Sequence, residues 1–358
     1  MYNRCMAFES CTYSSINQRR PDERSAGRQG VGKDRTPDIR GEKEMKKEEF
    51  YYDSRDNQSR IHAVRYTPED QEPVCVVQII HGMAEYFERY EEFARFLTQR
   101  GCIVTGNDHL GHGKSVGEDG VYGYFCEQDP ATVVVRDVHR LKKMTQQSYP
   151  ALPYIIIGHS MGSFILRNYL TMYGSGISGA VIMGTGYQTK GAMTAARLMV
   201  QIQKLFLGSK HVSRFCDKIS FGSYNKRIPD VKTAYDWLSK NEESVQKYID
   251  DPLCGNIFTL NGFQTLTELI MRAHDPERLK KIPAGLPLMV ISGDADPLGE
   301  YGEGIPKVCE GLRSVGVKDV EMHLCPTGRH ELLNEPEREE IMEVIYEWIR
   351  KHCLASCA

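Results

Sequence analysis

Two five-residue segments of the chain match the pattern G-x-S-x-G, which places a nucleophilic serine between two glycines in many hydrolases. They are Gly158–Gly162, with Ser160 at its centre, and Gly113–Gly117, with Ser115 at its centre. The chemistry requires a serine on a sharp turn from a strand into a helix, because such a turn holds the hydroxyl clear of the backbone. The sequence around each serine therefore decides between them.

Ser160 has the surroundings that this turn requires. The apolar run Tyr154–Ile157 precedes it and predicts a strand, and residues 164–173 follow it with helical spacing. Ser115 instead follows the polar segment 108–112, and more glycine-rich sequence lies beyond it. The sequence therefore predicts Ser160 as the nucleophile and a tight turn around Ser115.

A serine nucleophile needs a base, and in this arrangement the chain order is serine, acid, histidine. Among the late histidines, His323 lies inside a strand-like run and His352 in a terminal helix, so we interpret both as structural. His330 follows a strand in a loop that can turn its imidazole back toward the serine. We therefore expect His330 to remove the proton of the nucleophile.

The acid should also stand at the end of a strand. The apolar run 286–292 ends in Gly293–Pro297, which contains Asp294 and Asp296. Asp296 lies farther along the turn, where the loop can bring its carboxylate beside the histidine. Asp294 suits a turn-former that caps backbone amides. We predict Asp296 as the acid, with Asp294 as the alternative.

The negative charge that develops on the acyl oxygen needs two fixed donors. One is expected to be the backbone N–H of Met161, directly after the nucleophile. The other is expected from the segment His81–Glu85, where Gly82 permits a turn that points the N–H of Met83 inward. Water activated by the histidine would then hydrolyse the acyl-enzyme.

Short apolar runs alternate with amphipathic stretches from residue 46 onward. This alternation predicts a mostly parallel central sheet with helices on both faces, an α/β fold. Residues 49–53 and 60–66 predict a hairpin, and residues 187–266 have helical spacing without strand runs. We expect a core of residues 46–186 and 267–358 with a helical cap at 187–266. The other strands are expected at 74–80, 102–106, 154–157, 179–183, 286–292 and 320–325.

Residues 1–45 differ from the rest in composition. They are rich in Arg, Ser, Gly, Asp and Glu and lack apolar periodicity, so we expect them to be disordered. The sequence from Met45 onward looks like a natural beginning, and our hypothesis is that translation starts there.

The chain of 358 residues has a net charge of −3, which gives no electrostatic argument for a nucleic-acid partner. No apolar stretch approaches the roughly 20 residues of a membrane span, and none forms a secretory signal, so we expect a cytoplasmic location. The 11 cysteines are scattered without a C-x-x-C pair, and we expect reduced, mostly buried thiols.

No cofactor is needed for this chemistry, and none is expected. Residues 113–115 resemble the end of a phosphate-binding loop, but Asp108 stands where that pattern requires glycine. His109 and His112 lie near Asp108, yet loops of this composition more often satisfy their own backbone than bind metal. We predict no metal site.

Five segments in a fixed order resemble monoacylglycerol lipases and the related bacterial lysophospholipase-like hydrolases of the serine aminopeptidase S33 grouping. The segments are His81–Glu85, Asp108–Gly113, Gly158–Gly162, Gly293–Pro297 and Gly328–Glu335. The resemblance covers about residues 46–352. It implies the α/β-hydrolase fold, the triad Ser160, Asp296 and His330, and the same two oxyanion donors. The chain departs from the family at Tyr86, where histidine is common.

Six apolar residues recur at helical spacing in the expected cap: Met193, Leu198, Met199, Ile202, Leu205 and Phe206. In the family a cap covers the active site and can admit an acyl chain. These side chains are therefore candidate contacts for a monoacylglycerol or lysophospholipid. Alternatively, the stripe only packs the cap onto the core. At most, the cap is expected to contact a membrane or micelle transiently.

Functions of several classes stay open. The main prediction is hydrolysis of a small lipid-like carboxylic ester through an acyl-enzyme, with generic carboxylesterase activity or acyl transfer to another alcohol as variants. Aminopeptidase activity is the alternative that the S33 grouping suggests. Proline-releasing peptidases of this grouping usually carry Gly-Gly-x-Gly where this chain has residues 81–84. A non-catalytic binding protein is disfavoured because no member of the triad is missing.

Overall fold

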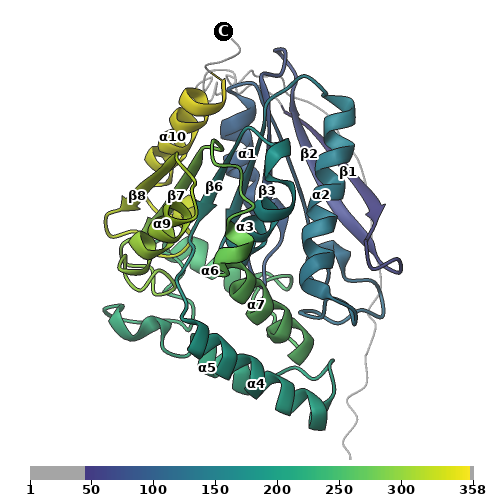
Figure 1. Cartoon of the computed structure of the whole chain (residues 1–358), viewed down its shortest axis with the longest axis vertical. Coiled ribbons are helices and arrows are strands. Elements are labelled where there is room, and N and C mark those ends of the chain that lie inside the picture. Colours follow the sequence, from purple (N-terminus) through teal and green to yellow (C-terminus); the bar gives the residue numbers. More distant parts are fainter. Residues whose placement is uncertain (1–44, 355–358) are drawn as a thin grey trace, which may run out of the picture. The chain divides into compact units, whose positions relative to one another are not determined.

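An eight-stranded sheet forms the centre of the computed structural model, which describes residues 45–354 (Figure 1). Its order is β1-β2-β4-β3-β5-β6-β7-β8. The pairs β1–β2 and β2–β4 are antiparallel, and the other neighbours are parallel. The strands are β1 (Met45–Asp53), β2 (Arg60–Pro68), β3 (Cys75–Ile80), β4 (Cys102–Asn107), β5 (Tyr154–His159), β6 (Gly179–Met183), β7 (Leu288–Gly293) and β8 (Val320–Cys325).

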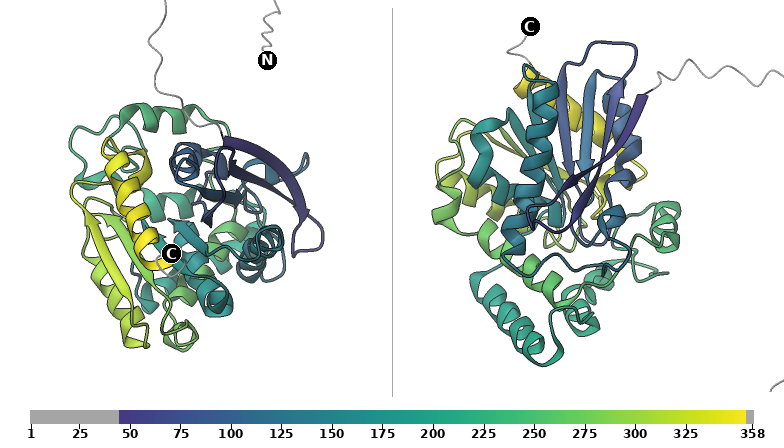
Figure 2. Two further views of the ribbon diagram at one scale, coloured as in Figure 1. Left: turned by 90° about the horizontal axis from the view of Figure 1, so that it is seen from above. Right: turned by 90° about the vertical axis from the view of Figure 1, so that its right-hand side faces the viewer.

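Helices cover both faces of this sheet, as Figures 1 and 2 show. Trp348 of α10 shares a buried cluster with Phe93 of α1 and with Ile155 and Ile157 of β5. The intervening residue, Ile156, belongs to the cluster on the other face. A strand that is apolar on both sides must be covered on both sides, so the sequence pattern explains the layers. These helices are α1 (Glu91–Thr98) and α10 (Arg338–Ile349), and across the sheet α2 (Pro130–Ser148), α3 (Met161–Tyr173) and α9 (Gly304–Ser314).

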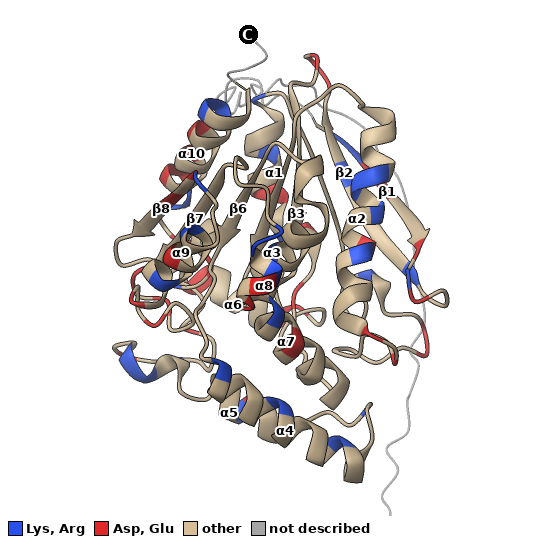
Figure 3. Cartoon of the chain, viewed as in Figure 1, with Lys and Arg blue, Asp and Glu red and all other residues tan. Residues whose placement is uncertain are grey.

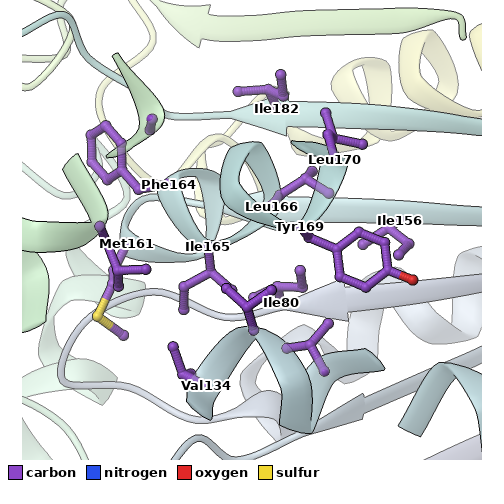
Figure 4. Packing of buried hydrophobic residues seen from close by; sticks show 14 of the residues in the cluster. Ile80, Val134, Ile156, Met161, Phe164, Ile165, Leu166, Tyr169, Leu170 and Ile182 are labelled. Atoms are coloured by element: carbon purple, nitrogen blue, oxygen red, sulfur yellow. The ribbon is translucent and has the colours of Figure 1, made fainter. Parts of the chain in front are cut away.

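The core on the α3 side consists of close apolar packing between strands and helices. Figure 4 shows Ile80, Ile156 and Ile182 of three neighbouring strands around Ile165 and Leu166 of α3. All five side chains are at most 1% exposed. This packing fixes the helix that begins directly after Ser160 against the strands that end beside it.

The region expected to form a cap consists of helices, with one isolated bridge between Val212 and Thr259. The expected boundary at residue 266 falls inside a helix, α7. This helix packs against both α3 and α4, because buried residues such as Phe263 and Leu269 continue along its length. The helices are α4 (Lys190–Leu207), α5 (Arg214–Phe221), α6 (Glu242–Asp250), α7 (Leu260–Ala273) and α8 (Pro276–Leu279).

The observed elements follow the expected pattern closely. The predicted hairpin is the β1–β2 pair, and the runs at 179–183 and 320–325 coincide with β6 and β8. The disorder expected for residues 1–45 lies outside the described residues except for Met45, which begins β1. The start of translation at Met45 stays a prediction. Eight cysteines in the described range are free and buried.

Candidate active site

Ser160 stands at a strained turn between β5 and α3. Its backbone has φ 54° and ψ −120°, a left-handed conformation that costs energy for a residue with a side chain. The flanking glycines make the turn possible because Cβ atoms there would collide with backbone. A Cβ on Gly162 would strike the carbonyl of Ile80 in β3, and one on Gly158 would strike the carbonyl of Gly162. The turn therefore has the geometry that was expected of a nucleophile.

His330 and Asp296 meet beyond the ends of β7 and β8. The Nδ1 atom of His330 lies 2.9 Å from Oδ2 of Asp296, and both side chains are almost fully buried. Oδ1 of Asp296 accepts a hydrogen bond of 2.8 Å from the N–H of Leu298. The two loops approach this closely because Gly293 has no side chain, since a Cβ there would collide with the carbonyl of Gly328.

Asp294 serves a different purpose, although it is only two residues from Asp296. Its exposed carboxylate accepts a 2.6 Å hydrogen bond from the N–H of Thr327, a residue with φ 57°. It therefore stabilises the turn before His330 rather than contacting the imidazole. The structure pairs His330 with Asp296, and the role of either carboxylate in catalysis stays a prediction.

The two expected oxyanion donors lie on either side of the serine. Within residues 45–354, neither the N–H of Met83 nor that of Met161 donates to a protein acceptor. Met161 is the first residue of α3, where N–H groups lack helical partners and the helix dipole favours negative charge. A Cβ added to Gly82 would lie 3.1 Å from Cβ of Ser160, so the loop that carries Met83 passes directly over this serine.

Side chains and backbone of residues 235–256 hold the segment His81–Glu85, the proposed oxyanion loop, from outside. Ala84, with φ 54°, directs its carbonyl toward residues 235–256. That carbonyl accepts hydrogen bonds from the hydroxyl of Tyr248 at 3.1 Å and from the N–H of Gly255 at 3.0 Å. The hydroxyl of Tyr86, the residue that departs from the family, donates to Asp251 at 2.7 Å.

Ser160, His330 and Met83 line one cavity of about 280 Å³. Its outer wall comes from α5 and from the segment between η4 (Tyr224–Arg227) and α6. The ring of Trp237 lies 5.0 Å from the imidazole of His330, measured between centroids. The apolar part of this wall consists of Phe221, Tyr235, Trp237, Leu238 and Tyr248.

Three carboxylates reach this cavity, and those of Glu85 and Glu331 are paired with Arg89. Asp217 of α5 is half-buried in the same cavity, and burial raises its pKa above the ordinary value. Within the described part of the chain, no side chain forms an ion pair or a hydrogen bond with this carboxylate. It is therefore open to a donor on a bound molecule.

The six cap residues expected at the substrate are not brought to this cavity. Leu205 and Phe206 are 81% and 79% exposed, and Leu198 and Ile202 are more than half exposed. Met193 and Met199 are partly buried and pack against the core, and Met193 lines a different cavity. The helical periodicity of α4 was predicted well, but periodicity alone does not tell which face of a helix a cavity lies on.

Ser115 and the nearby histidines have structural partners. The Ser115 hydroxyl donates a hydrogen bond of 2.7 Å to the carbonyl of Asp108. It accepts one of 2.9 Å from the backbone N–H of His62. Burial lowers the pKa of His112 to about 4 and that of His109 well below its usual value, so both are neutral. Among residues 45–354, no cluster of His, Cys, Asp and Glu has the arrangement of a metal site.

The sequence did not reveal a buried charged cluster behind the oxyanion loop. Arg89 bonds to the carboxylates of both Glu85 and Glu331. His159, directly before the serine, lies 3.3 Å from Glu85. Burial lowers the pKa of His159, but the hydrogen bond and charge of Glu85 outweigh this and raise it. Only the spacing of Glu85 and Arg89, four residues apart, hinted at a pair.

Comparison with known proteins places this arrangement in a family. The model of the family described as serine aminopeptidase, S33 matches residues 71–337, which is most of the chain and includes Ser160, Asp296 and His330. The chain belongs to this S33 family. Its mostly parallel sheet with helices on both faces is the α/β-hydrolase fold, as predicted.

Several relatives of this S33 protein have named activities. A monoacylglycerol lipase of Mycolicibacterium smegmatis is 28% identical over 80% of this chain and 91% of its own length. The human monoglyceride lipase is 28% identical over 65% of this chain and 69% of its own length. A solved carboxyl esterase from Bacillus coagulans, in complex with glycerol, has a TM-score of 0.80 at 28% identity, covering 86% of this chain and 99% of the esterase.

Proposed function

We propose that this protein hydrolyses the ester bond of a lipid with a single acyl chain and a small polar head group, of the monoacylglycerol type. The broader statement, that it is a carboxylic ester hydrolase, rests on its esterase and lipase relatives. The finer one rests on the cavity, where Ser160 and His330 face aromatic side chains and the unpaired carboxylate of Asp217.

The reaction would proceed through a covalent intermediate. His330 removes the proton of the Ser160 hydroxyl as its oxygen attacks the acyl carbon, while Asp296 holds the imidazole in one tautomer. The N–H groups of Met83 and Met161 stabilise the oxyanion. The protonated imidazole then gives its proton to the leaving alcohol, and a water activated by the same group releases the acid.

The cavity supports a substrate with one acyl chain. Its volume of about 280 Å³ lies near the lower end of ligand pockets, which favours a substrate with one acyl chain over a bulkier lipid. Phe221, Trp237 and Leu238 offer an apolar wall for the chain. The carboxylate of Asp217 can accept hydrogen bonds from the hydroxyls of a glycerol head group.

Exposed apolar side chains on α4 and α5 support transient contact with a lipid surface. Figure 3 shows blue basic segments along these two helices, and α4 contains three Lys or Arg and no acidic residue. Basic and apolar residues on one helix favour the surface of a membrane with anionic lipids. None of the helices in the described residues combines the length and apolar character needed to cross a bilayer. The exposed apolar residues are Leu198, Ile202, Leu205, Phe206, Leu207, Phe215 and Ile219.

A substrate panel tests this function. The wild type should hydrolyse monoacylglycerols and p-nitrophenyl esters, with little action on triacylglycerols or amino-acid arylamides. Ser160→Ala should lose activity by about 10⁴-fold or more and stay folded. Asp217→Ala should lose more activity on monoacylglycerol than on a p-nitrophenyl ester of the same acyl chain. Faster cleavage of the arylamides than of any ester would instead establish an aminopeptidase.

A further inference from the structure

The buried ion-pair cluster behind the active site connects three loops that each carry a reacting group. Nη1 of Arg89 lies 2.6 Å from Glu85 and 2.7 Å from Glu331, and Nη2 lies 2.8 Å from the second oxygen of Glu331. The guanidinium of Arg89 therefore binds Glu331 through two parallel hydrogen bonds, a geometry that fixes both the distance and the orientation of the two groups. Arg89 lies in the short 3-10 helix Phe87–Tyr90, which follows the oxyanion loop.

Each partner in this cluster is next to a residue of the proposed reaction. Glu331 directly follows His330 in the chain. Oε1 of Glu85 accepts the N–H of Gly82 at 2.6 Å, one residue before the oxyanion donor Met83. The cluster thus holds the base loop and the oxyanion loop through one guanidinium.

The nucleophile turn is joined to the same cluster through His159. Its Nε2–H donates to the carbonyl of His330 at 3.1 Å, and its Nδ1 lies 2.9 Å from the hydroxyl of Tyr90. The Tyr90 hydroxyl in turn donates to Glu85 at 2.8 Å. Displacing any member would therefore move the turn, the oxyanion loop or the base loop relative to the other two.

We propose that Arg89 and Glu331 are positioning residues, whose ion pair sets the distance between the oxyanion donor on Met83 and the imidazole of His330. This inference rests on the proposed ester hydrolysis at Ser160. The pair spans 242 positions of the chain, and both side chains are nearly buried. A displacement of about 1 Å between reacting groups can reduce turnover about 100-fold, so the loss of this ion pair should have a measurable effect on the rate.

Four single variants test the proposal in the full chain. Glu331→Gln and Arg89→Met remove one charge each, and Arg89→Lys keeps the charge but loses the paired geometry. Arg100→Met is the matched control, because Arg100 bonds Glu343 at 2.8 Å across a similar separation, far from the reacting loops. The measurements are kcat and KM on a p-nitrophenyl ester, the rate at which an alkyl fluorophosphonate labels Ser160, and the folded fraction from urea unfolding.

We expect kcat to fall about 100-fold in Glu331→Gln and Arg89→Met with KM nearly unchanged. Labelling should slow in parallel, and Arg89→Lys should lie between these variants and the wild type. The double variant Arg89→Met/Glu331→Gln should be no slower than the slower of its two single variants. Arg100→Met should keep the wild-type values. Losses that merely follow the unfolded fraction, or variants as fast as the wild type, would overturn the proposal. If the wild type is labelled at Ser160 but cleaves no ester, the proposed function fails, and the labelling rates still decide this inference.

Discussion

Two aspartates on one turn show how strongly a residue's role depends on its immediate partners. Asp294 accepts a hydrogen bond from a backbone N–H in the next loop, whereas Asp296 accepts one from the imidazole of His330. An amide oxygen can replace a carboxylate oxygen as the acceptor of a backbone N–H. It cannot stabilise a positively charged imidazole in the same way, and an amide N–H favours the wrong tautomer.

Asp296→Asn should therefore lower kcat by about 10⁴-fold, the scale of this change in serine proteases. Asp294→Asn should keep nearly wild-type turnover, because its oxygen still accepts the N–H of Thr327. Stopped-flow or steady-state hydrolysis of a p-nitrophenyl ester compares the two. Greater damage from the change at position 294 would exchange the roles of the two aspartates.

At this scale the sequence predicted the residues that stand at strand ends. Ser160, Asp296 and His330 could be found because each follows an apolar run, and the chain order restricts their roles. The ion pair between Arg89 and Glu331 could not be predicted, because residues 242 positions apart in the chain meet only in the folded structure.

The helix after Ser160, α3, depends on an unusually close approach to a strand. Gly162, the second residue of α3, lies against the carbonyls of Ile80 and His81 at the end of β3. Any Cβ there would have to push α3 away from the sheet. Because the oxyanion loop begins at these same carbonyls, that shift would also separate the two oxyanion donors.

Gly162→Ala should therefore destabilise the fold by at least about 2 kcal/mol, the cost of overpacking a tight core. Gly311→Ala in α9 is the matched control, because its Cβ would meet nothing within 4 Å. It should be neutral or stabilise the protein by about 0.5–1 kcal/mol through the helix preference for alanine. Urea unfolding measures both. Equal stability of the two variants would show that the close approach has no energetic importance.

The helices and strands themselves were predicted better than the boundaries between regions of the chain. The sequence located β6 and β8 to the residue, and for β6 the reason is that a strand buried along its whole length must be apolar throughout. The boundary of the cap was placed at residue 266, inside α7, since one amphipathic helix serves both regions. No change in composition marks the point where the partner of its apolar face changes from α4 to α3.

Across the whole molecule, the cap region has two different surfaces. The segment from Tyr235 to Gly255 lines the cavity and contacts the oxyanion loop. In contrast, α4 lies at one end of the sheet, at the bottom of Figure 1, and exposes Leu205 and Phe206 almost fully. Exposed apolar side chains of this size on basic helices fit a lipid surface better than water.

The double variant Leu205→Asp/Phe206→Asp should bind vesicles containing phosphatidylglycerol at least about 10-fold more weakly than the wild type, because it removes apolar area and adds negative charge. Vesicle sedimentation measures this. Met322→Asp, at an exposed site on β8, is the control and should bind like the wild type. Hydrolysis of a water-soluble ester should not change in either variant. Unaltered vesicle binding by the double variant would exclude α4 as the contact.

The helical character of residues 187–266 was predictable from the absence of strand runs, but the contacts of these helices were not. Four residues of the predicted apolar stripe on α4 face solvent and two pack against the core, whereas aromatic residues farther along the chain line the cavity at Ser160. Side-chain types at helical spacing define an apolar face, and only the tertiary arrangement decides whether that face meets a core, a cavity or solvent.

The carbonyl of Ala84 has a consequence for how this enzyme could be re-engineered. Because Tyr248 and Gly255 both bond to it, part of the cap acts as a clamp on the loop that carries Met83. Exchanging caps between homologues would succeed only if this clamp and its loop are transplanted together. A chimera that replaces only α4 and α5 would alter access to the pocket while the reacting groups keep their alignment.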